Sequence, residues 1–148
     1  MIYTPLTKKA LKISFEAHKE QFDKSGIPYV YHPYELASQM TTEAETCVAL
    51  LHDIVEDTST TFEDLINEGF DGEIIDAIRL MTHNDGSNYF DYVKRIKQNP
   101  IAKAVKLADL RHNSTISRLD EITPKDLERV EKYKQAIEIL QGNVEERK

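Results

Sequence analysis

Residues 42–58 read TEAETCVALLHDIVEDT, and the spacing of their apolar side chains predicts an amphipathic α-helix. Those side chains follow the i, i+3, i+4, i+7 and i+11 repeat of one helical face, which we expect to pack inward. They belong to Ala44, Cys47, Val48, Leu51 and Val55. His52 and Asp53 lie at the edge of this stripe, near the C-terminal end of the predicted helix.

Helix-start signals occur along the rest of the chain, and nothing in the sequence predicts a strand. A capping residue followed by proline marks a helix start, because proline is favoured in the first helical turn. Such pairs are Thr4-Pro5, Asn99-Pro100 and Thr123-Pro124. Thr61 with Asp64 resembles a capping box and opens a further helix, and segments 74–81 and 90–96 carry helical repeats. The sequence therefore predicts an all-α protein.

Glycine and proline set the boundaries that we expect in the first third of the chain. The first helix should end near Lys24, before a Ser-Gly pair. Segment 27–33 should be extended or turn-like, because a residue before proline avoids the α region. We therefore expect His32 at a junction between a loop and a short helix over about 33–40.

The last helix and the turn before residue 90 complete the predicted fold. Residues 84–87, Asn-Asp-Gly-Ser, form a turn cluster. The last helix should bury one apolar stripe and stop at Gly142. This stripe consists of Leu127, Val130, Ile137 and Leu140.

The composition excludes several classes of protein. The 148 residues suit one hydrophobic core, and no stretch approaches the roughly 20 apolar residues that span a bilayer. The N-terminus lacks the apolar region of a signal peptide, so we expect a cytoplasmic location. A net charge of −7 argues against binding of DNA, RNA or a membrane surface, because phosphate backbones are bound chiefly by Lys and Arg. An anionic substrate would need a local positive charge, which a divalent metal ion could supply.

Four residues of metal-binding type are spread along the chain. Adjacent residues His52 and Asp53 point about 100° apart on a helix, so both reach one ion only if other elements complete its coordination. His32 stands beside Pro33, where a side chain can be aimed at a helix bundle. Asp109 lies in an apolar helix, where an unpaired buried charge is unfavourable. We predict a divalent ion on His32, His52, Asp53 and Asp109.

Other polar residues near these ligands suggest a reaction. Two acidic residues, Glu56 and Asp57, follow the His-Asp pair by one helical turn, and Lys106 and Asn113 share the helical face of Asp109. Two histidines and two carboxylates leave coordination positions open for water and a phosphate oxygen. Glu56 or Asp57 could then accept the proton of the attacking water. The pattern predicts hydrolysis of a phosphate ester or anhydride.

Each of these residues also has an ordinary structural explanation. His32 could cap a helix, and Asp109 could pair with Lys106 or Arg111. The acidic pair could begin a turn, with its side chains bonded to nearby backbone groups. We favour the metal site because four candidate ligands of suitable type occur in one helical chain.

The order H…HD…D resembles the HD-domain superfamily of metal-dependent phosphohydrolases. Four longer segments resemble the hydrolase domain of the RelA/SpoT alarmone enzymes and their small stand-alone hydrolase relatives. They are AHxxQ at 17–21, KSGxPYVxHP at 24–33, ALLHDxVEDT at 49–58 and VKLADxxHN at 105–113. The resemblance runs from about residue 10 to 120. With a packing helix over about 123–141, it implies one HD domain over residues 1–148.

The resemblance implies a helical bundle in which the four ligands hold Mn²⁺. It also implies release of pyrophosphate from the 3′ position of the nucleotide ppGpp or pppGpp, with Glu56 and Asp57 as the catalytic acidic pair. Asn113 matches a residue that contacts the nucleotide, and Lys24 matches a basic position near it. Basic residues near Asp109 add two further candidates. The candidate substrate contacts are thus Lys24, Lys106, Arg111 and Asn113.

Two positions depart from the family pattern. Asp23 stands where the family has a phosphate-binding arginine, and its carboxylate would repel the substrate. Arg111 is shifted by one position along its helix. Two alternatives therefore stay open: a phosphohydrolase of another nucleotide, and a catalytically silent nucleotide-binding or protein-interaction domain. The intact acidic pair argues against the silent domain. No synthetase domain is expected in this chain, and its sequence predicts no particular oligomeric state.

Overall fold

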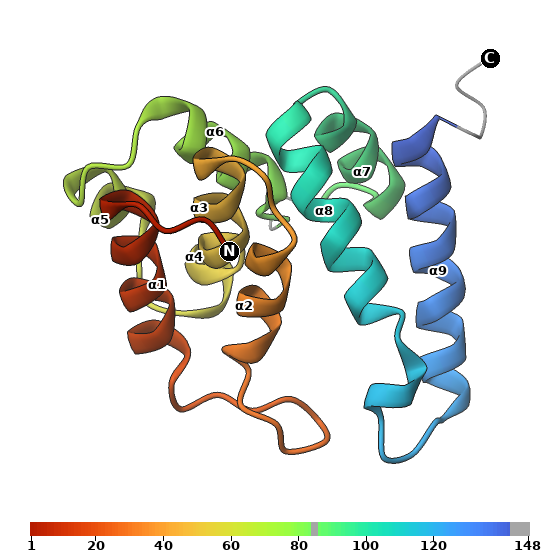
Figure 1. Cartoon of the computed structure of the whole chain (residues 1–148). Coiled ribbons are helices and arrows are strands. Elements are labelled where there is room, and N and C mark those ends of the chain that lie inside the picture. Colours follow the sequence, from red (N-terminus) through yellow and green to blue (C-terminus); the bar gives the residue numbers. More distant parts are fainter. Residues whose placement is uncertain (84–85, 143–148) are drawn as a thin grey trace.

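The computed structural model describes residues 1–83 and 86–142, and every regular element in them is helical (Figure 1). The predicted all-α class is confirmed. Turn residues 84 and 85 lie outside the described part of the chain. The elements are α1 (Pro5–His18), α2 (Tyr31–Ser38), α3 (Glu43–Leu51), α4 (Ile54–Asp57), α5 (Phe62–Asn67), α6 (Gly72–Met81), α7 (Tyr89–Lys97), α8 (Pro100–Asn113), the 3₁₀ turn η1 (Ile116–Arg118) and α9 (Pro124–Gln141).

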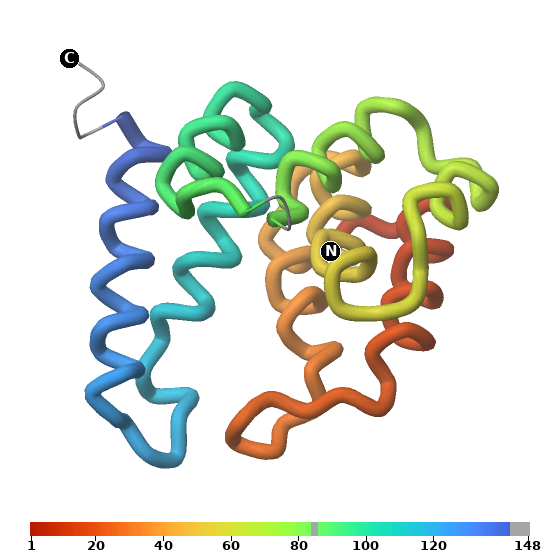
Figure 2. The backbone as a smooth tube through the Cα atoms, turned by 180° about the vertical axis from the view of Figure 1, so that it is seen from behind, coloured from red at the N-terminus to blue at the C-terminus, as the bar shows by residue number. Residues whose placement is uncertain are grey.

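Helix α8 joins the two sides of the molecule. Figures 1 and 2 show α1 to α6 on one side of it and α7 and α9 on the other. On the first side α8 contacts α2, α3 and α6, and on the second it contacts α7 and α9. A polar residue on α8 can therefore meet side chains from α2 and α3 in the interior. No helix in the described residues is long and apolar enough to cross a membrane.

Helix α3 lies at the centre of the first side. Residues 46–51 are all buried, because α3 contacts α1, α2, α6 and α8. The predicted inward face is confirmed at Cys47, Val48 and Leu51, which are fully covered. Thr46 and Leu50 are buried as well, so the helix is surrounded on almost all sides rather than half exposed.

The predicted helix through Val55 is interrupted at His52 and Asp53. Helix α3 ends at Leu51, His52 is its C-cap, and Asp53 is the N-cap of the short helix α4. The ring nitrogen Nδ1 of His52 lies 2.8 Å from the Ala49 carbonyl oxygen. In a continuous helix this oxygen would accept the backbone N–H of Asp53. The histidine therefore takes the place of a backbone hydrogen bond where the helix breaks.

The chain between α1 and α2 differs from the predicted boundaries. Helix α1 ends at His18 rather than near Lys24, and α2 begins at Tyr31 rather than Pro33. Between them the chain doubles back, with Asp23 N–H donating to Ile27 O at 2.9 Å and Tyr29 N–H donating to Gln21 O at 2.8 Å. These bonds satisfy backbone groups that a longer α1 would otherwise pair. Proline at position 33 is tolerated because it lies in the first turn of α2.

The ends of α9 agree with the sequence, and its predicted buried face agrees only in part. Thr123 and Asp126 form a capping box, and Gly142 ends the helix with a positive φ of 76°. Leu140 is fully buried, whereas Leu127 is 54% exposed. The prediction of an inward Leu127 was wrong, because it is the neighbouring Asp126 that is buried in the first turn of α9. Asp126 accepts hydrogen bonds there from Lys24 and from the backbone N–H of Thr123.

Two leucine substitutions in α9 test this packing. We expect Leu140→Ala to lower the free energy of unfolding by about 2–5 kcal/mol, because it leaves a cavity in the core. Leu127→Ala should change it by less than about 0.5 kcal/mol, because that side chain is mostly in water. Urea denaturation of both variants measures the difference. Equal losses would mean that the helix presents the face that the sequence predicted.

Candidate metal centre

Three candidate ligands from three helices meet where α2, α3 and α8 come together. His32 lies in the first turn of α2, His52 caps α3, and Asp109 lies on α8. Their exposed fractions are 5%, 4% and 6%, and one ligand atom of each lies within 4.8 Å of the others. His32 Nε2 is 2.9 Å from Asp109 Oδ1, and His52 Nε2 is 3.6 Å from the same oxygen. The structure thus brings Asp109 together with two histidines that precede it by 57 and 77 positions in the sequence.

Asp53, the fourth predicted ligand, lies beside this group. Its Oδ1 is 2.8 Å from His52 Nε2, and its other oxygen accepts a hydrogen bond from the hydroxyl of Tyr29. Because the helix breaks between α3 and α4, neighbouring residues His52 and Asp53 can both turn toward the same point.

The orientation of His52 suits a metal ligand. Its Nδ1 faces the Ala49 carbonyl oxygen, so Nδ1 carries the proton and donates. The other nitrogen, Nε2, is then a lone-pair acceptor that faces carboxylate oxygens of Asp53 and Asp109. It is buried and makes no hydrogen bond within the described residues. A cation between these atoms would satisfy all of them, so the donor set fits a metal ion.

The electrostatics of the ligands also favour a cation. Burial lowers the pKa of His32, so its ring stays neutral as metal binding requires. Burial and the nearby Asp109 carboxylate raise the pKa of Asp53 well above its ordinary value. Burial would also raise the pKa of Asp109, but Lys106 and His32 hold it well below the ordinary value. The two neighbouring carboxylates of Asp53 and Asp109 therefore compete for ionisation, and a divalent cation would allow both to be charged.

Asp109 is held by residues around it. Lys106 Nζ donates to its Oδ2 at 3.0 Å, and Asn113 Nδ2 donates to its Oδ1 at 3.1 Å. His32 is fixed in turn by His112, since their Nδ1 atoms are 2.7 Å apart and their rings stack at 5.0 Å. Such partners orient ligands and tune a metal site.

A small cavity of about 170 Å³ opens beside this cluster and contains the predicted acidic pair. Glu56 and Asp57 line it together with His52, Asp53 and Asp109. Glu56 Oε1 accepts the backbone N–H of His83 at 3.2 Å. The Asp57 carbonyl accepts Gln21 Nε2 at 3.1 Å, and the buried His18 lies 2.8 Å from Gln21 Oε1. The AHxxQ segment therefore positions the acidic turn.

A second cavity, of about 470 Å³, lies on the other side of His32. Its polar lining includes Asn113, His112 and the pair Asp23 and Arg118. The Arg118 guanidinium is 3.7 Å from Asp23 Oδ2 and also donates to the His112 carbonyl at 2.9 Å. The cavity thus contains an arginine at position 118, which pairs with the Asp23 carboxylate.

Sequence reasoning missed Arg118. It follows α8 in the 3₁₀ turn η1, 95 residues from Asp23, and no helical repeat connects the two. The sequence contains only a weak signal, an arginine five residues after Asn113, the last residue of α8.

The other candidate substrate contacts divide into two groups. Lys106 and Asn113 lie in the site, bonded to Asp109. Arg111 is exposed and lies two residues beyond Asp109, about 200° around α8 and therefore on its far side. Lys24 donates to the buried Asp126 of α9 at 2.7 Å, and it is not among the described residues that line either cavity.

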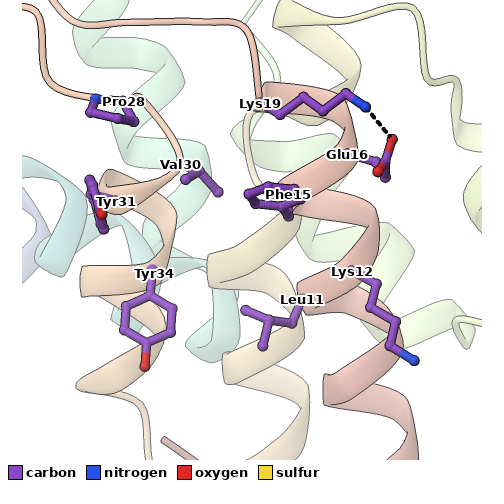
Figure 3. Close-up of a pocket in the computed structure, with 9 residues that line it drawn as sticks. All are labelled: Leu11, Lys12, Phe15, Glu16, Lys19, Pro28, Val30, Tyr31 and Tyr34. Atoms are coloured by element: carbon purple, nitrogen blue, oxygen red, sulfur yellow. Dashed lines mark ion pairs between the residues drawn. The ribbon is translucent and has the colours of Figure 1, made fainter.

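A cavity of about 780 Å³, larger than either of these two, lies elsewhere, between α1 and α2 (Figure 3). Leu11, Phe15, Val30 and Tyr34 make it apolar. Its charged groups are lysines and Glu16 at the rim, where Glu16 pairs with Lys19 at 3.1 Å. None of the four candidate ligands lines it.

No family model matches the chain, but curated proteins do. It is 35% identical over 124 residues to the guanosine-3′,5′-bis(diphosphate) 3′-pyrophosphohydrolase of Borreliella burgdorferi, covering 72% of this chain and 18% of that protein. It is 30% identical over 125 residues to the probable GTP pyrophosphokinase of Mycobacterium leprae, and this match covers 76% of this chain and 16% of that protein. It is 29% identical over 120 residues to the bifunctional (p)ppGpp synthase/hydrolase SpoT of Escherichia coli, and this match covers 72% of this chain and 17% of that protein. The chain thus spans less than a fifth of the length of these relatives.

A solved structure matches almost the whole chain. It is a metazoan orthologue of SpoT that hydrolyses ppGpp, with a TM-score of 0.73 and 23% identity over 97% of this chain and 89% of that one. This likeness shows that the two share a fold. By its sequence relatives and its fold, the chain is an HD-type domain related to the hydrolase domain of the RelA/SpoT proteins.

Proposed function

We propose that this chain is a metal-dependent phosphohydrolase that releases pyrophosphate from the 3′ position of ppGpp or pppGpp. The observation that carries the proposal is one cavity in which the acidic residues Glu56 and Asp57 face the His/Asp cluster. The names of the relatives, among them guanosine-3′,5′-bis(diphosphate) 3′-pyrophosphohydrolases, support the substrate.

The metal ligands in this proposal are His32, His52, Asp53 and Asp109, and the ion is Mn²⁺. Neutral imidazoles and carboxylates suit a borderline divalent ion, and the open side of the cluster faces the cavity of Glu56. When bound, the ion would lower the pKa of water and screen the negative charge of the phosphate.

The chain's own residues supply the proton transfer and the orientation. The bond from His83 N–H fixes one oxygen of Glu56 and leaves the other free to accept a proton from water. Asp57 is anchored through its carbonyl by Gln21, which places the second carboxylate beside the first. Lys106, buried against Asp109, adds a positive charge to the same cavity.

The sizes of the two cavities suggest which part of the substrate each of them binds. Whole small-molecule sites typically measure about 300–1,000 Å³, so the cavity of about 170 Å³ suits the reacting pyrophosphoryl group alone. The cavity of about 470 Å³ is large enough for the nucleoside part. Asn113 and Arg118 line it and would contact the substrate there. The roles of Lys24 and Arg111 stay predictions.

Hydrolysis of another nucleotide is the second candidate. Asp23 favours it, because the cavity of about 470 Å³ contains a carboxylate where the family pattern has a cation. Pyrophosphate release from ppGpp, compared with phosphate release from GTP, GDP and other nucleotides in the presence of Mn²⁺, separates the two. Turnover of another nucleotide without any of ppGpp would refute the alarmone substrate.

Glu56→Gln tests the proposed proton acceptor. We expect kcat for ppGpp to fall by about 10²–10⁴-fold, because an amide cannot take the proton of water. Metal content should stay as in the wild type. The exposed Glu63→Gln serves as the matched control and should retain full turnover. A Glu56→Gln enzyme with wild-type kcat would remove Glu56 from the mechanism.

Asp109→Asn tests the metal site. We expect the purified wild-type protein, loaded with Mn²⁺ and dialysed, to keep stoichiometric metal by elemental analysis. Asp109→Asn should lose most of it, because a neutral amide is a poor ligand and leaves Lys106 unpaired. Asp76→Asn, at an exposed position of α6, should bind metal normally. Equal metal in wild type and Asp109→Asn would exclude Asp109 as a ligand.

Arg118→Ala tests the cation supplied by η1. We expect KM for ppGpp to rise about tenfold or more, because one charged hydrogen bond to the substrate is worth about 1.5–3 kcal/mol. The rise should exceed that of Arg111→Ala, whose side chain lies on the far side of α8. A larger effect at Arg111 would support the prediction made from the sequence instead.

A further inference from the structure

Tyr89 carries a buried hydroxyl without a partner. The oxygen neither donates nor accepts a hydrogen bond within the described residues. Its neighbour one turn along α7, Tyr92, is different: the Tyr92 hydroxyl donates to the Met81 carbonyl at 2.6 Å. Buried hydroxyls are nearly always paired, so an unpaired one calls for an explanation.

The position of Tyr89 connects it to the proposed reaction. It is the first residue of α7 and lines the cavity of about 170 Å³ together with Glu56, Asp57 and Asp109. A group that enters this cavity would therefore meet the acidic pair and the wall formed by Tyr89.

A lysine ammonium group lies against each of the two tyrosine rings of α7. Lys132 Nζ of α9 lies 4.4 Å from the centre of the Tyr89 ring, and Lys106 Nζ lies 5.3 Å from the centre of the Tyr92 ring. Burial raises the pKa of Tyr89 to about 12, so its hydroxyl is protonated and a donor at neutral pH. Such a hydroxyl can donate a hydrogen bond to an anionic oxygen.

We propose that the Tyr89 hydroxyl donates a hydrogen bond to an oxygen of the pyrophosphoryl group that the substrate releases. The inference rests on the proposed function and adds a residue to it. The bound group satisfies a hydroxyl that the free protein leaves unpaired. Tyr89 is then a substrate contact that holds the pyrophosphoryl group while the bond to the nucleoside 3′ oxygen breaks.

Tyr89→Phe tests the contact by three measurements. We expect kcat/KM for ppGpp with Mn²⁺ to fall about tenfold to a hundredfold, the effect of losing one hydrogen bond to a charged group. The affinity for inorganic pyrophosphate, measured by calorimetry on the Mn²⁺-loaded protein, should fall by a similar factor. The melting temperature of the free protein should not fall, because the removed hydroxyl has no partner there.

Tyr92→Phe is the matched control for stability. It should lower the melting temperature, because the Met81 carbonyl loses its buried donor. A Tyr89→Phe protein with unchanged kcat/KM and unchanged pyrophosphate affinity would overturn the inference, as would one that is destabilised like Tyr92→Phe. If the wild type hydrolyses no ppGpp, the proposed substrate fails, and the pyrophosphate affinities alone then decide the role of Tyr89.

Discussion

The structure depends on one buried carboxylate, that of Asp109. It receives hydrogen bonds or close contacts from His32 of α2, His52 at the end of α3, and Lys106 and Asn113 of its own helix. An unpaired charge in this interior would be strongly unfavourable, so the helices must approach closely enough to surround it. The same contacts that join α8 to α2 and α3 also assemble the candidate ligands. The contacts that hold these helices together are therefore also the contacts that form the candidate site.

Local signals in the sequence predicted much of the fold. Capping residues such as Thr4, Asn99 and Thr123 start helices where expected, because a cap depends on neighbours within a few positions. The break at His52 and the exposed face at Leu127 were not predictable in this way. The first depends on a side chain that bonds a backbone carbonyl, and the second depends on which parts of α9 have a neighbour.

The candidate site, too, was predictable from the sequence only in part. Residue type and order indicated the ligands, and the structure places His32, His52 and Asp109 together. No sequence pattern marks Arg118 or the unpaired hydroxyl of Tyr89, because their place in the site depends on segments that are distant in the sequence. Residues that act as ligands are constrained in type, whereas a cation that faces a phosphate can come from any element that borders the cavity.

Two ion pairs fasten the segment between α1 and α2 to the C-terminal part of the chain. Lys24 reaches Asp126 of α9, and Asp23 reaches Arg118 of η1. The Lys24 and Arg118 side chains are 53% and 31% exposed, so dissolved salt screens both pairs. The segment they hold forms one wall of the cavity assigned to the nucleoside. Raising the ionic strength therefore weakens the attachment of that wall to the C-terminal part of the chain. This effect is separate from the screening of an anionic ligand.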